Sequence, residues 1–281
     1  MISSPPIALS IAGSDSSGGA GIQADLKTFA ALGVYGVNAV TAIVAEIPGE
    51  VVRMEPCDST LLHQQLNRVH AGFPVAAAKT GMLASAKNVE VVVGFFQENR
   101  EIQLVIDPIF RATADDVCLL ERSGVAILIR DLLPLASLIT PNRMEAETIL
   151  GKAIETVEDF ESAPRELFET HGCPVLLKGG HFPQHEDDML TDVAWLGDGE
   201  LLRLRHKRQP DQDLHGTGCA LSSALTACLA LGRAPAESLI QATEYLQSAM
   251  DEHFHWPNEK SGGVAALNHF PNGATVPRHD P

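Results

Sequence analysis

The stretch IALSIAGSDSSGGAGIQADLKTFAALG, residues 7–33, contains the unit from which we expect the whole chain to be built. Its first six residues are apolar or small and are followed by glycine, which is typical of a buried parallel strand. A glycine-rich loop follows at 13–21. The next residues place Ile22, Leu26 and Phe29 on one face of a helix that ends near Gly33. Strand, loop and helix together predict one βα unit.

Two interpretations of the loop at 13–21 stay open. It lacks the Lys-Ser/Thr ending of a P-loop and the glycine spacing of a dinucleotide-binding fingerprint. The glycines can allow a small ligand to approach the backbone, or they can make a tight turn between strand and helix.

Polar residues follow the further predicted strands, which are expected at 37–45, 75–78, 104–106, 136–139 and 175–177. The residues that these strands deliver are Glu46, Lys79, Asp107, Asn142 and Lys178. Helices are predicted between them, at 60–69, 87–98, 125–132, around Glu145 and Glu147, and at 160–169. Because ligands bind at the carboxyl ends of the strands in open α/β sheets, these side chains indicate one functional edge.

The repeated alternation of strand and helix predicts an α/β fold with a mostly parallel sheet and helices on both faces. An Asp-Gly turn at Gly197-Asp198-Gly199 predicts a small antiparallel edge. We expect a single domain over residues 1–281, loop-like after Trp256 and loose after about residue 271.

Composition limits the kinds of partner. The net charge of −16 argues against nucleic acid or an anionic membrane as the main partner. No apolar run reaches the roughly 18 residues of a membrane span, and the first residues lack the basic region of a secretory signal. The five cysteines are odd in number and contain no CxxC pair, which favours reduced thiols in the cytoplasm.

The segment His215-Gly216-Thr217-Gly218-Cys219 lies directly before a predicted helix over 220–231, which Gly232 and Pro235 are expected to end. Unpaired first-turn N–H groups and the helix dipole suit an anion, most often a phosphate. A thiol at a helix start is also favoured as a thiolate. The alternatives are an ordinary Gly-x-Gly turn and a cysteine that only packs.

Taken together, these motifs resemble the hydroxymethylpyrimidine and phosphomethylpyrimidine kinases of thiamine biosynthesis, within the ribokinase-like superfamily. The resemblance covers roughly residues 7–270. The segments that carry it are 12–15, 18–28, 79–83, 107–108, 139–142 with Glu145, 178–181, 215–219 and 267–270. It implies a ribokinase-like three-layer sandwich and an ATP-dependent kinase that phosphorylates a small aminopyrimidine alcohol and its monophosphate.

The resemblance also implies residue roles. ATP would lie over Gly216, Thr217 and Gly218, with Lys178 and Asn142 at its phosphates. Asp107 and Glu145 would hold Mg²⁺, mostly through water. The residues that would surround the pyrimidine are Gly13, Ala20, Asp25, Val44, Glu46, Met82 and Ile109.

Cys219 stands where most ribokinase-like enzymes carry an aspartate base. The resemblance implies that the thiol accepts the proton of the substrate hydroxyl. We expect the helix N-terminus and Lys178 to lower the pKa of this thiol from its reference value of about 8.5.

The chain departs from the family pattern at three places, which leave open the substrate, the closure of the flap and whether both phosphorylation steps occur. The family usually has Pro at the position of Ser16 and Gln at the position of Glu46, and it tends to have a Lys-Ser-Gly flap where this chain reads 110–116. A carboxylate only accepts hydrogen bonds, whereas an amide also donates. Glu46 therefore keeps a pyridoxal/pyridoxine kinase as the nearest alternative. A non-catalytic ligand-binding relative is a second alternative, from a different class. By analogy we expect a homodimer.

Overall fold

A computed structural model describes residues 4–111, 118–180, 189–208, 214–257 and 263–271. Nine strands form one sheet in the order β3-β2-β1-β4-β5-β6-β7-β8-β9. Their bounds are β1 Ile7–Asp15, β2 Tyr35–Ile47, β3 Glu50–Pro56, β4 Val75–Thr80, β5 Gln103–Ile106, β6 Leu138–Ile139, β7 Val175–Leu177, β8 Met189–Trp195 and β9 Leu201–Lys207. The run from β2 to β7 is parallel, whereas β3 at one edge and β8 and β9 at the other are antiparallel.

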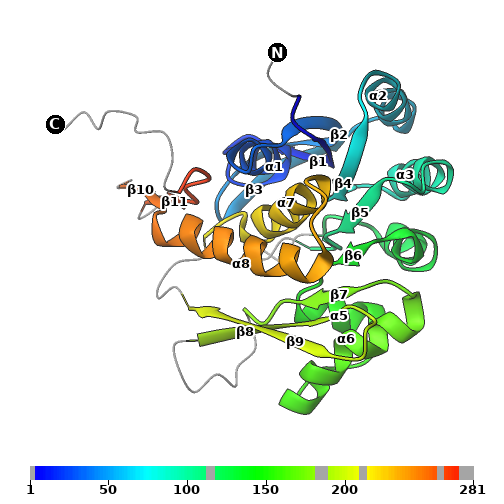
Figure 1. Ribbon diagram of the computed structural model, residues 1–281. Coiled ribbons are helices and arrows are strands. Elements are labelled where there is room, and N and C mark those ends of the chain that lie inside the picture. Colours follow the sequence, from blue (N-terminus) through cyan, green and yellow to red (C-terminus); the bar gives the residue numbers. More distant parts are fainter. Residues whose placement is uncertain (1–3, 112–117, 181–188, 209–213, 258–262, 272–281) are drawn as a thin grey trace.

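Helices cover both faces of this sheet (Figure 1). One layer contains α1 Gly21–Ala31, α7 Thr217–Ala230 and α8 Pro235–Asp251. The other contains α2 Ser59–Gly72, α3 Ala86–Glu98, α4 Arg122–Ile127, α5 Arg143–Leu150 and α6 Val157–His171, with a π-helical turn (η1, Leu128–Leu132) and a 3₁₀ turn (η2, Leu133–Leu135) after α4. The predicted three-layer α/β sandwich with an antiparallel edge is confirmed. The expectation of a single domain stays a prediction.

The strands are buried on both faces, so their side chains alternate between two cores. Leu104 and Ile106 pack with the layer of α2, α3 and α6, whereas Val105 between them packs with α7 and α8. Leu176 of β7 likewise packs towards α7, and its neighbour Leu177 towards α6. The apolar strands predicted from sequence therefore hold both helical layers.

Helix α7 is buried on nearly all sides because it lies between the sheet, α1 and α8 (Figure 1). Small residues permit this close packing, and Ala220, Ala224 and Ala227 are not exposed at all. The tight packing fixes the position of the N-terminus of α7, at which the predicted phosphate loop ends.

Three parts of the chain differ from the sequence-based expectations. Strand β3 was not predicted; it is an edge strand in which Val52, Arg53 and Glu55 are exposed. Pro235 was expected only to stop a helix, but it occupies the first turn of α8, where its missing N–H costs nothing. The expectation of a loop after Trp256 is wrong for 264–266, because β10 Phe254–Trp256 pairs with β11 Val264–Ala266. The predicted loose tail lies outside the described residues.

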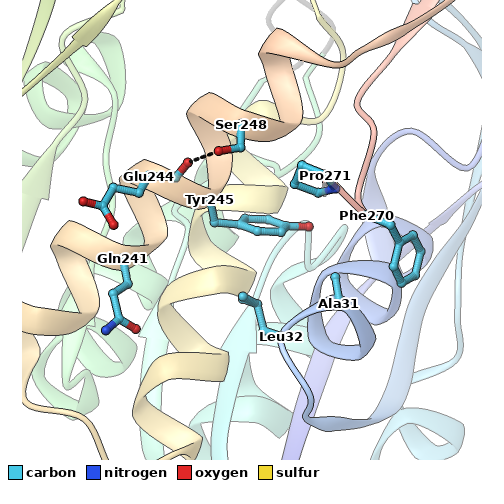
Figure 2. Close-up of a pocket in the computed structure, with 8 residues that line it drawn as sticks. All are labelled: Ala31, Leu32, Gln241, Glu244, Tyr245, Ser248, Phe270 and Pro271. Carbon is cyan, nitrogen blue, oxygen red and sulfur yellow. Dashed lines mark hydrogen bonds between the residues drawn. The ribbon is translucent and has the colours of Figure 1, made fainter. Parts of the chain in front are cut away.

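The segment after β11 is joined to α1 and α8 by hydrogen bonds. Nδ1 of His269 lies 3.1 Å from the hydroxyl of Thr28, and the Tyr245 hydroxyl donates to the His269 carbonyl at 2.9 Å. Tyr245 also lines a cavity of about 300 Å³ between α1 and α8. Figure 2 shows its ring reaching from α8 towards residues 270–271. The cavity lies apart from the strand ends that carry the predicted site.

We predict that His269 makes the fold sensitive to acid. Burial, with a smaller contribution from Lys27, lowers the pKa of His269 to about 4. Below about pH 6.5 the unfolded chain binds a proton here that the folded chain does not bind until about pH 4, so stability falls as the pH falls. His269→Asn retains an acceptor for Thr28 but does not titrate.

From pH 7.5 to pH 5, urea titrations should show the wild type losing about 2 kcal/mol more unfolding free energy than the variant. Equal losses in the two proteins would contradict this role of His269.

Candidate active site

The carboxyl ends of the parallel strands bring the predicted polar residues to one edge of the sheet. Asp15 ends β1, Glu46 lies near the end of β2, and Asp107 directly follows β5. Lys178 directly follows β7. Its backbone forms an isolated parallel β-bridge with Asn142, which lies beyond β6. The edge predicted from the sequence therefore exists, although its members come from positions more than 160 residues apart.

The buried carboxylates of Asp107 and Glu145 form a charged cluster with the half-buried Lys178. Nζ of Lys178 donates to Oδ1 of Asp107 at 2.9 Å and lies 3.8 Å from Oε2 of Glu145. Burial opposes the charge on Lys178, but the two carboxylates hold its pKa above the usual value. The two predicted metal ligands and the predicted phosphate-binding lysine are thus neighbours.

Glu145 is positioned by the start of α5. Asn142 caps this helix, its side chain accepting from the Glu145 N–H, and the Glu145 carboxylate accepts from the Asn142 N–H. Burial raises the pKa of Glu145 to about 7; Lys178 opposes this rise and Asp107 adds to it. Asp107 and Glu145 thus share a single lysine, Lys178.

The N-terminus of α7 points at the same cluster. Gly216 has φ of +88°, and a Cβ atom there would lie 1.8 Å from the carbonyl oxygen of Gly19. Only glycine fits this contact between the two glycine-rich loops. A Cβ atom on Gly218 would instead lie 3.5 Å from both Asp107 Oδ2 and Lys178 Nζ. The predicted phosphate loop thus faces the charged cluster.

One prediction about Cys219 is wrong. The thiol was expected to have a lowered pKa, but burial raises it to about 11, and Asp25 and Asp107 add to the rise. The charge of Lys79 opposes the rise. The helix N-terminus and Lys178 do not compensate for the loss of water around the sulfur.

The residues predicted to surround a pyrimidine come together at the ends of β1, β2 and β4. Met82 and Val44 both lie against Gly13, where a Cβ atom would be 2.4 Å from the Met82 methyl group. Val44 and Met82 belong to an apolar cluster with Ala42 and Ala84. The N–H of Ala20 donates to Asp15 at 2.7 Å, and Ile109 lies near Gly81.

Asp25 differs from these residues because its side chain is completely buried. Its carboxylate accepts hydrogen bonds from Ser10, Lys79 and Ser223. A direct contact with substrate, as predicted, is not available to it in this arrangement.

Sequence reasoning did not find the group formed by Asp15, Glu46 and His215. Nε2 of His215 lies 3.2 Å from Asp15 Oδ2, and the ligand atoms of all three residues lie within 4.8 Å of one another. Burial opposes ionisation of both partners, yet their hydrogen bond raises the pKa of His215 and helps to hold that of Asp15 well below its usual range. The sequence signal that could have indicated this group is the position of Asp15 at the end of a predicted strand.

Glu46 belongs to the same group. Burial and the charge of Asp15 raise the pKa of Glu46. The Ser16 hydroxyl donates to the Glu46 carbonyl at 2.6 Å and accepts from its N–H at 2.9 Å. The two unusual residues noted in the sequence are therefore in direct contact.

Comparison with known proteins agrees with this geometry. The phosphomethylpyrimidine kinase family model matches residues 15–264. The chain belongs to this family. It is 41% identical over 245 residues to a hydroxymethylpyrimidine/phosphomethylpyrimidine kinase of Rhizobium meliloti (strain 1021), covering 87% of this chain and 90% of that protein. The predicted family and the prediction of a phosphotransferase are thereby confirmed.

Solved structures of two kinases resemble the chain. A phosphomethylpyrimidine kinase from Clostridium difficile 630 has a TM-score of 0.76 and 35% identity, covering 87% of this chain and 99% of that one. A Bacillus subtilis pyridoxal kinase in complex with ADP has a TM-score of 0.83 and 34% identity, covering 95% and 98%. The fold is therefore shared by kinases of two different substrates.

Two glycines of the phosphate loop should respond differently to alanine. In Gly216→Ala the alanine must adopt the left-handed conformation of this position, and its Cβ atom clashes with Gly19. We therefore expect a loss of about 2–4 kcal/mol in unfolding free energy. In Gly218→Ala the new Cβ atom would lie at ordinary contact distance from Asp107 and Lys178, and alanine favours the helix over glycine, so we expect the unfolding free energy to change by less than about 1 kcal/mol. Denaturant unfolding of both variants measures the difference, and equal losses would contradict the role given to the Gly216–Gly19 contact.

Proposed function

We propose that this protein transfers the γ-phosphoryl group of ATP to the hydroxymethyl group of 4-amino-5-hydroxymethyl-2-methylpyrimidine, and then phosphorylates the resulting monophosphate. The observation that carries the proposal is that the N-terminus of α7 faces Lys178 and Asp107, while the buried apolar cluster of Val44 and Met82 lies at neighbouring strand ends. The family and the names of the relatives support the same substrate.

The nucleotide would bind with its phosphates at Gly216, Thr217 and Gly218. The first-turn N–H groups and the dipole of α7 suit an anion, and Lys178 adds a positive charge beside them. Asn142, which bridges to Lys178 and caps α5, would lie next to the phosphates. The ADP bound to the Bacillus subtilis pyridoxal kinase, a protein of the same fold, supports a nucleotide in this protein too.

The donor set around Asp107 and Glu145 fits Mg²⁺. Both groups are hard oxygen donors, and they lie close enough to share Lys178. These two carboxylates would hold the ion, which would supply charge neutralisation at the phosphates. The protein's own contribution is to keep both carboxylates buried and oriented, Glu145 through the capping box with Asn142.

In the proposed reaction the substrate hydroxyl oxygen forms a bond to the γ-phosphorus, and the bond from that phosphorus to the bridging oxygen of ADP breaks. The hydroxyl proton passes to the sulfur of Cys219. Phosphoryl transfer depends mostly on positioning and charge stabilisation, so a strong base is not required. Because the structure raises the pKa of Cys219 to about 11, the reaction depends on groups that favour its thiolate.

A second candidate is phosphorylation of pyridoxal. The specific observation in its favour is the TM-score of 0.83 to a pyridoxal kinase, together with a carboxylate at position 46. A non-catalytic binding protein is disfavoured because a ligand-binding role gives no reason for the charged cluster of Asp107, Glu145 and Lys178.

We further infer a homodimer in the cytoplasm. The dimer rests on family resemblance. The cytoplasm is supported by the five cysteines, all free thiols in the structure. In the part of the chain that the structure describes, no helix is both long and apolar enough to cross a membrane.

A coupled assay of ADP formation tests the proposal directly. Purified protein with ATP and Mg²⁺ would be given the hydroxymethylpyrimidine, its monophosphate or pyridoxal. We expect turnover on both pyrimidines and a fall of at least about 100-fold in kcat for Cys219→Ala, the usual scale for loss of a positioned proton acceptor. Preference for pyridoxal would select the second candidate, and no turnover on any of the three would contradict both.

Glu46 should affect the pyrimidine but not the nucleotide. We propose that its carboxylate accepts from the amino group and a protonated ring nitrogen of the substrate, two charge-assisted hydrogen bonds. Glu46→Gln replaces one acceptor by a donor, so we expect KM for the pyrimidine to rise about tenfold, equivalent to about 1.4 kcal/mol. KM for ATP should stay within about twofold of the wild-type value. A parallel rise in both KM values would contradict a specific contact with the pyrimidine.

A further inference from the structure

Asp15, Glu46 and His215 form a group of potential metal ligands that the proposed reaction does not use together. They come from three separate segments: the end of β1, the end of β2 and the residue just before Gly216. Nε2 of His215 lies 3.2 Å from Oδ2 of Asp15, and the ligand atoms of all three residues lie within 4.8 Å of one another. An imidazole nitrogen and two carboxylates thus lie in one place.

The distances within the group suit a zinc-like ion. Zn²⁺ binds nitrogen and oxygen at about 2.0–2.2 Å in a tetrahedral arrangement, which places neighbouring ligand atoms about 3.4 Å apart. The separation of 3.2 Å between His215 and Asp15 is close to this value. A movement of the Glu46 carboxylate by about 1–2 Å would bring it to the same spacing. Mg²⁺, by contrast, favours oxygen ligands in an octahedral arrangement.

Hydrogen bonds from the glycine-rich loop already orient the Asp15 carboxylate. The N–H of Ser17 donates to Oδ1 at 2.6 Å, and the N–H of Ala20 and the Ser17 hydroxyl donate to Oδ2 at 2.7 and 2.8 Å. Outer hydrogen bonds of this kind orient metal ligands in proteins. The side chain of Asp15 is 2% exposed and that of His215 is 27% exposed, so the group is sheltered but open to an ion from solvent.

Glu46 supplies the third ligand. Its backbone is fixed by the Ser16 hydroxyl, which accepts from its N–H and donates to its carbonyl. Among the described residues, no group donates a hydrogen bond to its carboxylate. Glutamine, which the family usually has at this position, would leave only Asp15 and His215 as ligands of the kind that bind zinc. The third ligand therefore comes from a departure of this chain from the family pattern.

We propose that Asp15, Glu46 and His215 bind a divalent transition-metal ion of the zinc class, with water as the fourth ligand. The ion takes the place of the proton that His215 donates to Asp15, and this proton passes to solvent. Because Glu46 cannot hold the ion and a pyrimidine at once, the ion also blocks the pyrimidine site. That last consequence rests on the proposed function, whereas the binding of the ion does not.

Isothermal titration calorimetry with Zn²⁺ alone tests the site, in protein free of nucleotide and pyrimidine. His215→Asn and Glu46→Gln each remove one ligand, and we expect Kd for Zn²⁺ to rise at least about tenfold in both, since even changes to residues that only support a ligand have effects of this size. The five cysteines are present in every protein compared, so the difference reports the proposed ligands.

Two variants serve as matched controls. His63→Asn changes an exposed histidine of α2, and Glu145→Gln changes a carboxylate of the proposed Mg²⁺ site. Kd for Zn²⁺ should stay within about twofold of the wild-type value in both. Absence of Zn²⁺ binding by the wild type, wild-type affinity in Glu46→Gln, or a loss confined to Glu145→Gln would overturn the proposal. If His215→Asn does not fold, Glu46→Gln decides alone, because it retains the Asp15–His215 hydrogen bond.

A titration with saturating hydroxymethylpyrimidine separates the metal site from the proposed function. In the wild type we expect the pyrimidine to weaken Zn²⁺ binding at least about tenfold. Zn²⁺ binding that depends on Glu46 and His215 but is unaffected by the pyrimidine would support the metal site and contradict the position proposed for the substrate.

Discussion

The backbone contact between Gly216 and Gly19 is the constraint on which the rest of the site depends. No side chain fits between these two loops, so the start of α7 lies directly against the loop that begins α1. This contact orients the first turn of α7 towards Asp107 and Lys178, and it places Cys219 beside Gly21. The same packing buries α7 between the sheet and two helices, which prevents the anion-binding end from moving away from the charged cluster.

The parallel sheet then separates two chemical environments along one edge. The ends of β5 and β7 carry the charged cluster of Asp107 and Lys178, which suits phosphates. The ends of β1 and β2 carry the carboxylate of Glu46 beside a buried apolar cluster that includes Val44, and the heterocycle is proposed to bind here. Cys219 lies between them because α7 crosses the sheet near β4 and β5. Phosphoryl donor and acceptor can therefore meet without large movements of the sheet.

Much of this arrangement was predictable because strand ends in a parallel sheet converge. That rule alone brought Glu46, Asp107 and Lys178 to one edge. The sequence did not predict β3, because its exposed residues give no clear apolar alternation. Pro235 was interpreted as a helix stop, although proline also begins helices. The charge state of Cys219 could not be predicted, because it depends on burial and on Lys79, more than 130 positions away in the chain. Local sequence reports a helix N-terminus but not how far water is excluded from it.

Hydrogen–deuterium exchange of the whole chain with and without Mg²⁺ and a non-hydrolysable ATP analogue tests most directly where phosphoryl transfer takes place. Our account predicts that the nucleotide slows exchange of the N–H groups at residues 216–220 and around Lys178, because phosphate oxygens would accept hydrogen bonds at the start of α7. Protection confined to other segments, with unchanged exchange at residues 216–220, would contradict the assignment of this helix end as the phosphate site.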